Sequence, residues 1–289
     1  MGIGSVSAVW RHPAKSMQGD TVAAATIGST GMLGDRAWAV RDEEKGGIRG
    51  AKKIGALMDL KAQFASEPTA DDPTPAIEIT LPDGTVVGSG DPDVNERLSA
   101  ALDRKVSLWP LQAPSDLDHY RRGAPDSDDL DAELRGMFGR LPDEPLPDFT
   151  PFMHVMEFES PPGTYLDAYP IHVLTEQSLQ ALQVLNPAST VDVRRFRPNL
   201  VLDLGDGSGE RFPELGWTGR RLRIGEVVLD VVYECPRCVM ITRPFADLEQ
   251  DRPLLRSVVK EAGQNVGVYA NVVQAGVVRP GDEAELLPA

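Results

Sequence analysis

Short apolar runs separated by turn residues constrain the fold of this chain more than any other feature. VSAVW (6–10), RAWAV (36–40) and EVVLDVVYEC (226–235) have the length and β-branched content of strands. Alternating apolar residues on both sides of Asp83-Gly84 predict a hairpin, because this dipeptide favours a tight turn. The pattern predicts a β-rich α+β fold.

Three segments with apolar residues at helical spacing predict a few helices beside the strands. The first spans 94–102 with Asp93 as N-cap, the second follows Thr175, and the third spans 253–262 before Gly263 as C-cap.

A stretch rich in proline and aspartate divides the chain. Residues 113–150 carry ten acidic and four basic side chains, and they read as a linker or long surface excursion. Because few apolar residues occur there, we expect it to be mobile and dispensable for folding. The predicted organisation is an N-terminal β unit (1–112), an acidic insert (113–162) and a C-terminal unit (163–289).

Charge and hydropathy exclude some partners. The 289-residue chain has a formal net charge of −15, so nucleic acid is a poor partner. No segment approaches the roughly 20 apolar residues that span a bilayer, and the N-terminus lacks the apolar core of a signal peptide. We expect a cytoplasmic protein that does not bind membranes.

The only two cysteines, Cys235 and Cys238, form one C-x-x-C motif after a strand. Arg237 beside them could lower the pKa of a thiol, and a thiolate suits metals bound through sulfur. A redox pair, a structural zinc site or two buried thiols are the alternatives. The redox motif should open a helix, which β-branched VMIT and Pro244 disfavour, and zinc needs about four ligands.

Three short polar motifs could bind an anion. HPAKSMQGD places Lys15 and Ser16 after a strand, GMLGDRAWAV places Arg36 before one, and RRFRPNLVLD (194–203) clusters three arginines ahead of Asn199. Taken singly, each has a simpler explanation: an exposed loop lysine, an Asp35–Arg36 turn ion pair, and a solvated sheet edge.

Taken together in this order, the motifs resemble a known family. HPAKS and LGDRAWAV are similar to the N-terminal β-barrel segment of molybdenum cofactor sulfurases, and RFRPNLVLD, C-x-R-C and GVYANVVQAG are similar to the MOSC domain. The same layout occurs in the mitochondrial amidoxime-reducing component and its bacterial counterparts. The resemblance implies an N-terminal β-barrel-like unit plus a MOSC β-barrel with peripheral helices.

The resemblance also implies a site for the molybdenum cofactor (molybdopterin). Cys238 corresponds to the sulfur ligand of the metal and would be the catalytic thiol. The positions that correspond to pterin-contacting residues are Lys15, Ser16, Arg36, Asp167, Ala168, Tyr169, Arg197, Asn199, Arg237 and Tyr269. After C-x-R-C the reductases of the family have T-x-D-P, and this chain has Thr242 followed by Arg243. Residues before and after the insert would meet in one positive cleft between the two units.

The implied activity is that of an oxidoreductase reducing N-hydroxylated or S-oxide small molecules. Its electrons would come from a partner iron–sulfur or flavin protein, since two cysteines are too few for a four-thiolate cluster. The alternatives are a sulfur or cofactor carrier using a persulfide on Cys238, and a non-catalytic scaffold.

Overall fold

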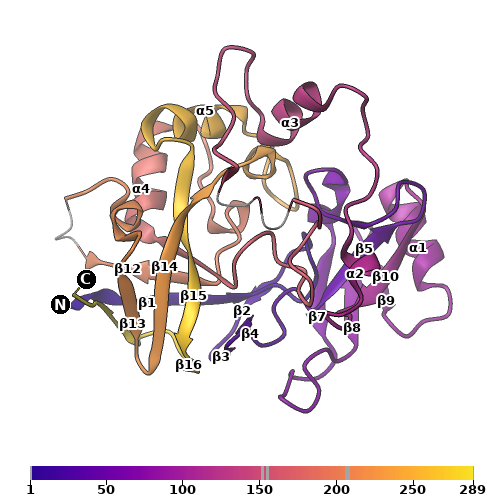
Figure 1. The fold of residues 1–289 in the computed structure, drawn as a ribbon, viewed down its shortest axis with the longest axis horizontal. Helices are drawn as coiled ribbons and strands as arrows, with labels where there is room; N and C mark the ends of the chain where they lie inside the picture. The colour runs from indigo at the N-terminus through magenta and orange to yellow at the C-terminus, as the bar shows by residue number, and fades with distance from the viewer. Residues whose placement is uncertain (1, 151–152, 154–155, 206–208, 289) are drawn as a thin grey trace.

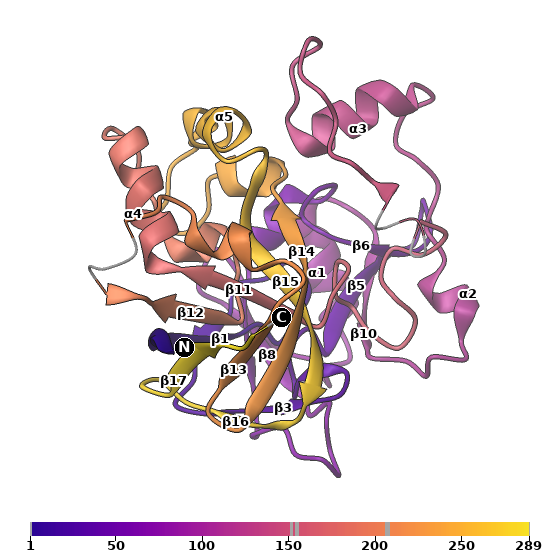
Figure 2. The ribbon, with the colours of Figure 1, turned by 60° about the vertical axis from the view of Figure 1, so that its left-hand side comes forward.

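The computed structural model describes residues 2–150, 153, 156–205 and 209–288. Its largest element is a closed barrel of seven strands (Figures 1 and 2). The barrel closes because β1 pairs with β17 on one side and with β12 on the other. In order round the barrel the strands are β12 (Leu200–Asp203), β11 (Ile171–Thr175), β15 (Asn265–Gln274), β14 (Val227–Pro236), β13 (Arg221–Ile224), β17 (Glu283–Leu286) and β1 (Gly2–Arg11).

Strand β1 comes from the N-terminal end of the chain but belongs to the barrel of the C-terminal unit. Its buried Val6 and Val9 join the barrel core with residues such as Leu200 and Leu222. Figure 1 shows both termini at the same edge of the molecule, where Gly2 pairs with Glu285. The predicted β-rich α+β class is confirmed, and the barrel incorporates both ends of the chain.

Most of the N-terminal unit outside β1 consists of two small sheets packed around a second core. The Asp83-Gly84 hairpin is confirmed, with Gly84 at φ 85° in the turn. One sheet contains β10 (Val106–Pro110), β5 (Trp38–Asp42) and β6 (Ile48–Arg49), and another contains β7 (Lys61–Phe64), β8 (Ile77–Thr80) and β9 (Val86–Gly88). Shorter strands are β2 (Asp20–Thr21), β3 (Ala25–Gly28), β4 (Gly31–Met32) and β16 (Gly276–Val278).

The three predicted helices are confirmed. They are α1 (Val94–Leu102), α4 (Glu176–Leu185) and α5 (Arg252–Glu261). Thr175 caps α4 by accepting a hydrogen bond from the Ser178 amide. Asp93 precedes α1 without a side-chain capping bond, and the C-cap of α5 is Ala262, one residue before Gly263. Within the described residues, no helix has the length and apolar character needed to span a membrane.

The acidic insert lies mostly at the surface, as the sequence predicted, and a few of its residues pack against the two units. It forms α2 (Leu117–Tyr120) and α3 (Leu130–Phe138), and Figure 1 shows α3 over the junction of the barrel and the N-terminal unit. Tyr120 is fully buried against Tyr165, and the Arg140 guanidinium is buried between the insert and β14's end. These few residues anchor a segment that is otherwise largely exposed, and its mobility and dispensability for folding stay predictions.

Candidate cofactor-binding site

A cavity of about 500 Å³ lies between the N-terminal unit, the insert and the barrel. This volume falls within the range of small-molecule and cofactor pockets. All eleven residues predicted from the sequence line it: Lys15, Ser16, Arg36, Asp167, Ala168, Tyr169, Arg197, Asn199, Arg237, Cys238 and Tyr269. The structure therefore brings together residues from before and after the insert, whereas their roles toward a cofactor stay a prediction.

Lys15 follows β1 and is almost fully buried. Its Nζ donates to Asp167 Oδ1 at 2.8 Å and to the Tyr165 carbonyl at 2.9 Å. Burial lowers the pKa of Lys15, and Asp167 opposes this effect. The Asp167 side chain is 48% exposed to the cavity, and although neighbouring protein atoms disfavour its charge, Lys15 and Lys52 outweigh this and hold the pKa of Asp167 well below its ordinary value. The exposed-lysine explanation is therefore wrong.

Arg36 and Arg197 lie against each other although their backbones come from different units. Arg36 Nη2 donates to the Arg197 carbonyl at 3.2 Å, and Arg36 also forms the Asp35 ion pair that the sequence suggested. Asp35 also accepts a hydrogen bond from Asn199, whose Nδ2 lies 2.9 Å from Asp35 Oδ2. Burial, followed by repulsion from Arg36, lowers the pKa of Arg197 to about 9. An anion in the cavity would relieve this repulsion.

Backbone strain gathers at the same residues. Ser16, Arg36 and Arg197 have φ angles of 66°, 50° and 55°, in the left-handed region that side chains disfavour. Such conformations persist where surrounding contacts enforce them, and they cluster at binding sites. Ser16 Oγ is fixed by the Ala51 amide at 2.9 Å. Two buried guanidinium nitrogens, Arg197 Nη2 and Arg237 Nε, have no hydrogen-bond partner within the described structure.

Aromatic and imidazole rings form one wall. Tyr269 stacks obliquely on Tyr169 and on His172, with ring centroids 5.5 and 5.7 Å apart. Burial, then the Arg237 charge, lowers the pKa of His172 to about 3, so its ring is neutral at physiological pH. Gly267 allows this packing because a Cβ there would lie 2.3 Å from His172 Nε2.

The two cysteines have different environments. Cys235 ends β14, is 1% exposed and accepts a hydrogen bond from Arg237 Nη1 at 2.9 Å. Cys238 lines the cavity and begins the 3-10 helix η6 (Val239–Thr242), so no α-helix follows the motif. Of the two thiols, the one that Arg237 hydrogen-bonds is therefore that of Cys235. Among the described residues, no group of three or more His, Cys, Asp and Glu could hold a metal ion.

The arginine cluster before β12 divides into different roles. Arg194 is paired with Asp192 and Asp247 at the surface. Arg195 donates to the carbonyls of Ile241 and Arg243 and so braces η6. Only Arg197 of the three has an unpartnered buried donor beside the cavity in the described part of the chain. The idea that all three arginines bind phosphate is therefore too broad.

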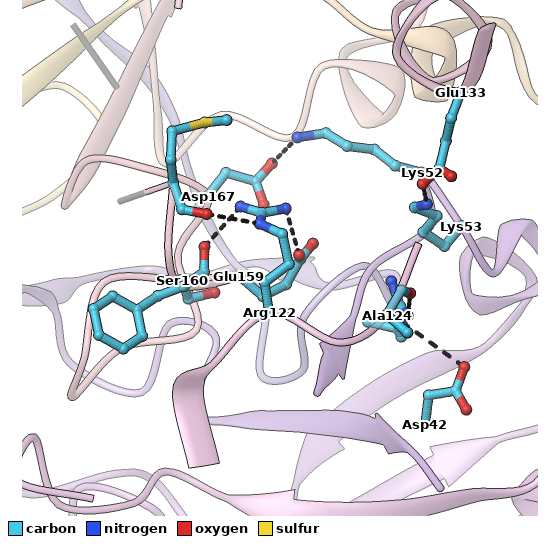
Figure 3. Close-up of polar contacts among 12 residues, drawn as sticks. Asp42, Lys52, Lys53, Arg122, Ala124, Glu133, Glu159, Ser160 and Asp167 are labelled. Carbon is cyan, nitrogen blue, oxygen red and sulfur yellow. Dashed lines mark hydrogen bonds and ion pairs between the residues drawn. The ribbon is translucent and has the colours of Figure 1, made fainter. Parts of the chain in front are cut away.

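Sequence reasoning missed several cavity residues from the N-terminal unit and the insert. Lys52 pairs with Asp167 at 3.6 Å, Lys53 pairs with Glu133, and Arg122 pairs with Glu159 at 2.7 Å (Figure 3). Asp167 raises the pKa of Lys52, which keeps that ammonium charged. The lysine pair was visible in the sequence, but nothing local indicated that it faces a cavity.

Arg243, which follows η6, turns toward the N-terminal unit. Its Nη2 donates to the Lys52 carbonyl at 3.4 Å, and it lies so close to Gly55 that a Cβ there would clash. Arg243 therefore contacts the segment that carries Lys52 into the cavity.

Comparison with known proteins agrees with this architecture. Residues 161–285 match the model described as MOSC domain, and residues 3–115 match the model described as MOSC N-terminal beta barrel domain. The chain belongs to the MOSC-domain family. Within this MOSC protein the two matched regions lie on either side of the insert.

Curated relatives match part of this MOSC protein. Mitochondrial amidoxime reducing component 2 of Rattus norvegicus is 33% identical over 133 residues, which cover 41% of this chain and 37% of the relative. The protein of the same name from Bos taurus is 30% identical over 132 residues, with 41% and 37% covered. The matches thus span well under half of the relatives' own length.

Two solved structures are also similar to this MOSC protein. The YUAD protein from Bacillus subtilis has a TM-score of 0.43 and 12% identity, covering 98% of this chain and 94% of that one. YiiM from Geobacillus stearothermophilus has a TM-score of 0.32 and 18% identity, covering 42% of this chain and 55% of that one.

Proposed function

We propose that the cavity binds a molybdenum cofactor of the molybdopterin type, with Cys238 as sulfur ligand to the metal. The observation that carries this proposal is the convergence of buried cations and one thiol around a single cavity in a chain of net charge −15. A pterin cofactor has an anionic phosphate and a polar ring system, so it needs such cations and amides.

The residues present fit this group. Arg197 Nη2 and Arg237 Nε are buried donors without partners, which a polar, anionic ligand would satisfy. Arg36 and Arg197 would hold the phosphate, and Asn199, Tyr169 and Tyr269 would contact the ring system. The ion pair between Lys15 and Asp167 would hold the loop after β1 against the loop before β11. Cys238 would supply the soft ligand that such a metal takes.

We further propose that the protein reduces N-hydroxylated or S-oxide small molecules with electrons from a partner iron–sulfur or flavin protein. The bound cofactor would supply the two-electron oxygen-removal chemistry, and the chain would orient the substrate and exclude water. His172 stays neutral, so it can accept or donate a hydrogen bond in the cavity without adding charge. Curated relatives named as amidoxime reducing components support this choice of substrate.

A sulfur or cofactor carrier is the alternative outcome. A persulfide carrier needs a thiol that another protein can reach, and Cys238 is 8% exposed inside the cavity. This burial favours the reductase.

The test is expression in a host that makes the cofactor, with molybdenum measured by mass spectrometry. We expect about one metal per wild-type chain, almost none in Cys238→Ser, and retention in the matched control Cys235→Ser. Reduction of benzamidoxime with a chemical electron donor then separates reductase from carrier. Metal-free wild-type protein, or full metal in Cys238→Ser, would overturn the cofactor assignment.

A further inference from the structure

Helix α3 of the insert has an apolar face that is only partly covered, with Phe138 packed against a core cluster. Leu130, Leu134, Met137 and Phe138 recur at positions i, i+4, i+7 and i+8, which places them on one side of the helix. All four line the cavity, and none of the side chains of α3 is fully buried. The opposite face is polar and carries the Asp131–Arg135 ion pair. The apolar side of α3 therefore faces the cavity.

Two residues beyond the helix extend this face. Phe149 packs on Phe138 with ring centroids 5.2 Å apart, and Met156 is 42% exposed at the cavity. We name this set the apolar wall: Leu130, Leu134, Met137, Phe138, Phe149 and Met156.

The apolar wall begins close to the candidate metal ligand. Phe138 packs against a core cluster that includes Met240, and a Cβ on the next residue, Gly139, would lie 3.9 Å from Val239 Cα, beside Cys238. The Lys52 ammonium lies 5.8 Å from the centre of the Phe138 ring, where the cationic side of the cavity meets the wall. The cations that would bind the cofactor, Arg36 and Arg197, come from other elements. A ligand at Cys238 therefore has charged groups on one side and apolar groups on the other.

Ion pairs hold the wall in place at both ends. Lys53 pairs with Glu133 on α3 (Figure 3). It also pairs with Asp126 before the helix, at 3.3 Å. Beyond the helix, Arg256 of α5 pairs with Glu144. These ion pairs tie the apolar wall to the N-terminal unit on one side and to α5 on the other.

We propose that the apolar wall binds the apolar body of the substrate, so that this protein prefers N-hydroxylated compounds with an aromatic or branched apolar group. The inference rests on the proposed function and specifies its substrate class. Apolar area removed from water stabilises the complex in proportion to that area, and a pterin offers little such area to this wall. The polar N–O end of the substrate would then point to Cys238.

The test compares two amidoximes that differ only in the apolar body, acetamidoxime and benzamidoxime, on the molybdenum-loaded protein. We expect kcat/KM for benzamidoxime to exceed that for acetamidoxime by at least about ten-fold. In Leu134→Asn this ratio should fall at least about three-fold. Leu141→Asn is the matched control, because Leu141 is 51% exposed in the same insert and does not line the cavity.

Met137→Gln gives an independent second variant, and urea unfolding checks that each variant is folded. A wild-type ratio near one, or equal ratios in Leu134→Asn, Met137→Gln and wild type, would overturn the proposal. If the loaded wild-type protein reduces neither compound, the proposed function fails instead. Calorimetric binding then tests the apolar wall separately. Tighter binding of benzamidoxime than of acetamidoxime, weakened in Leu134→Asn, supports the proposal. Equal binding of both compounds overturns it.

Discussion

Lys15 and Asp167 form an ion pair at 2.8 Å, although 152 residues separate them in the sequence. The pair connects the loop after β1 with the loop before β11, so it joins segments from both sides of the insert. Lys15 is 3% exposed, and Lys52 approaches the same carboxylate at 3.6 Å. Cavity geometry therefore depends on one carboxylate shared by two lysines.

Replacing Asp167 by Asn should destabilise the fold, because it leaves the buried Lys15 ammonium without its counter-ion. We expect the free energy of unfolding to fall by about 1–3 kcal/mol, measured by urea denaturation at pH 7. Asp20→Asn is the matched control: Asp20 pairs with Lys61 at the same 2.8 Å, but both side chains are exposed. That change should cost less than about 1 kcal/mol. Equal losses in the two variants would contradict the role of burial.

Stability should fall as the pH drops, and His172 should contribute to that loss. In the folded protein, burial and the charges of Arg237 and Arg36 lower the pKa of His172 to about 3 from its ordinary 6.5. The Glu214 carboxylate opposes this shift only in part. Below pH 6.5 the unfolded chain binds a proton that folded His172 does not, so its stabilising contribution is full above pH 6.5 and is lost toward pH 3.

His172→Gln removes this linkage. Between pH 7 and pH 5 the variant should lose less unfolding free energy than wild type, by on the order of 2 kcal/mol. Urea denaturation at both pH values measures the difference. Parallel pH profiles for variant and wild type would show that His172 titrates normally in the folded protein.

Arg36→Ala should lower cofactor retention nearly as much as Arg197→Ala, because the two guanidinium groups lie together at one end of the cavity. We expect molybdenum content to fall several-fold in each, measured by mass spectrometry. Arg194→Ala is the control, since Arg194 lies three residues before Arg197 but forms ion pairs with Asp192 and Asp247 at the surface. Full metal content in Arg36→Ala would contradict a role of the N-terminal unit in cofactor binding.

Arg140 should act as a positioning residue for the cysteine loop. Its Nη2 donates to the Arg237 carbonyl at 3.1 Å, and its Nε donates to Gln264 Oε1 at 2.8 Å. Arg140→Met should leave that buried carbonyl unpaired and destabilise the fold by about 1–3 kcal/mol, with lower molybdenum content. Arg211→Met is the control: Arg211 is exposed and paired with Glu261 at 3.5 Å, so its loss should change neither quantity appreciably. Unchanged stability and metal content in Arg140→Met would refute the assignment.

Local sequence determined the elements and the chemistry available to the site. Apolar alternation gave the strands, Thr175 and the 3.6-residue spacing gave α4, and Asp83-Gly84 gave a hairpin. These features depend on neighbours within a few residues, which sequence displays directly. The motif residues around Lys15, Arg197 and Cys238 were likewise recognisable, because each lies in a short segment of fixed spacing.

Tertiary structure alone decided where these pieces meet. That β1 closes the barrel, that Arg237 hydrogen-bonds Cys235 and that Lys52 faces the cavity all depend on partners far away in sequence. Leu130, Leu134, Met137 and Phe138 had helical spacing in the sequence, but their surroundings were rich in aspartate and proline. Periodicity shows that a helix has an apolar face, whereas only the packing of distant segments decides what that face contacts.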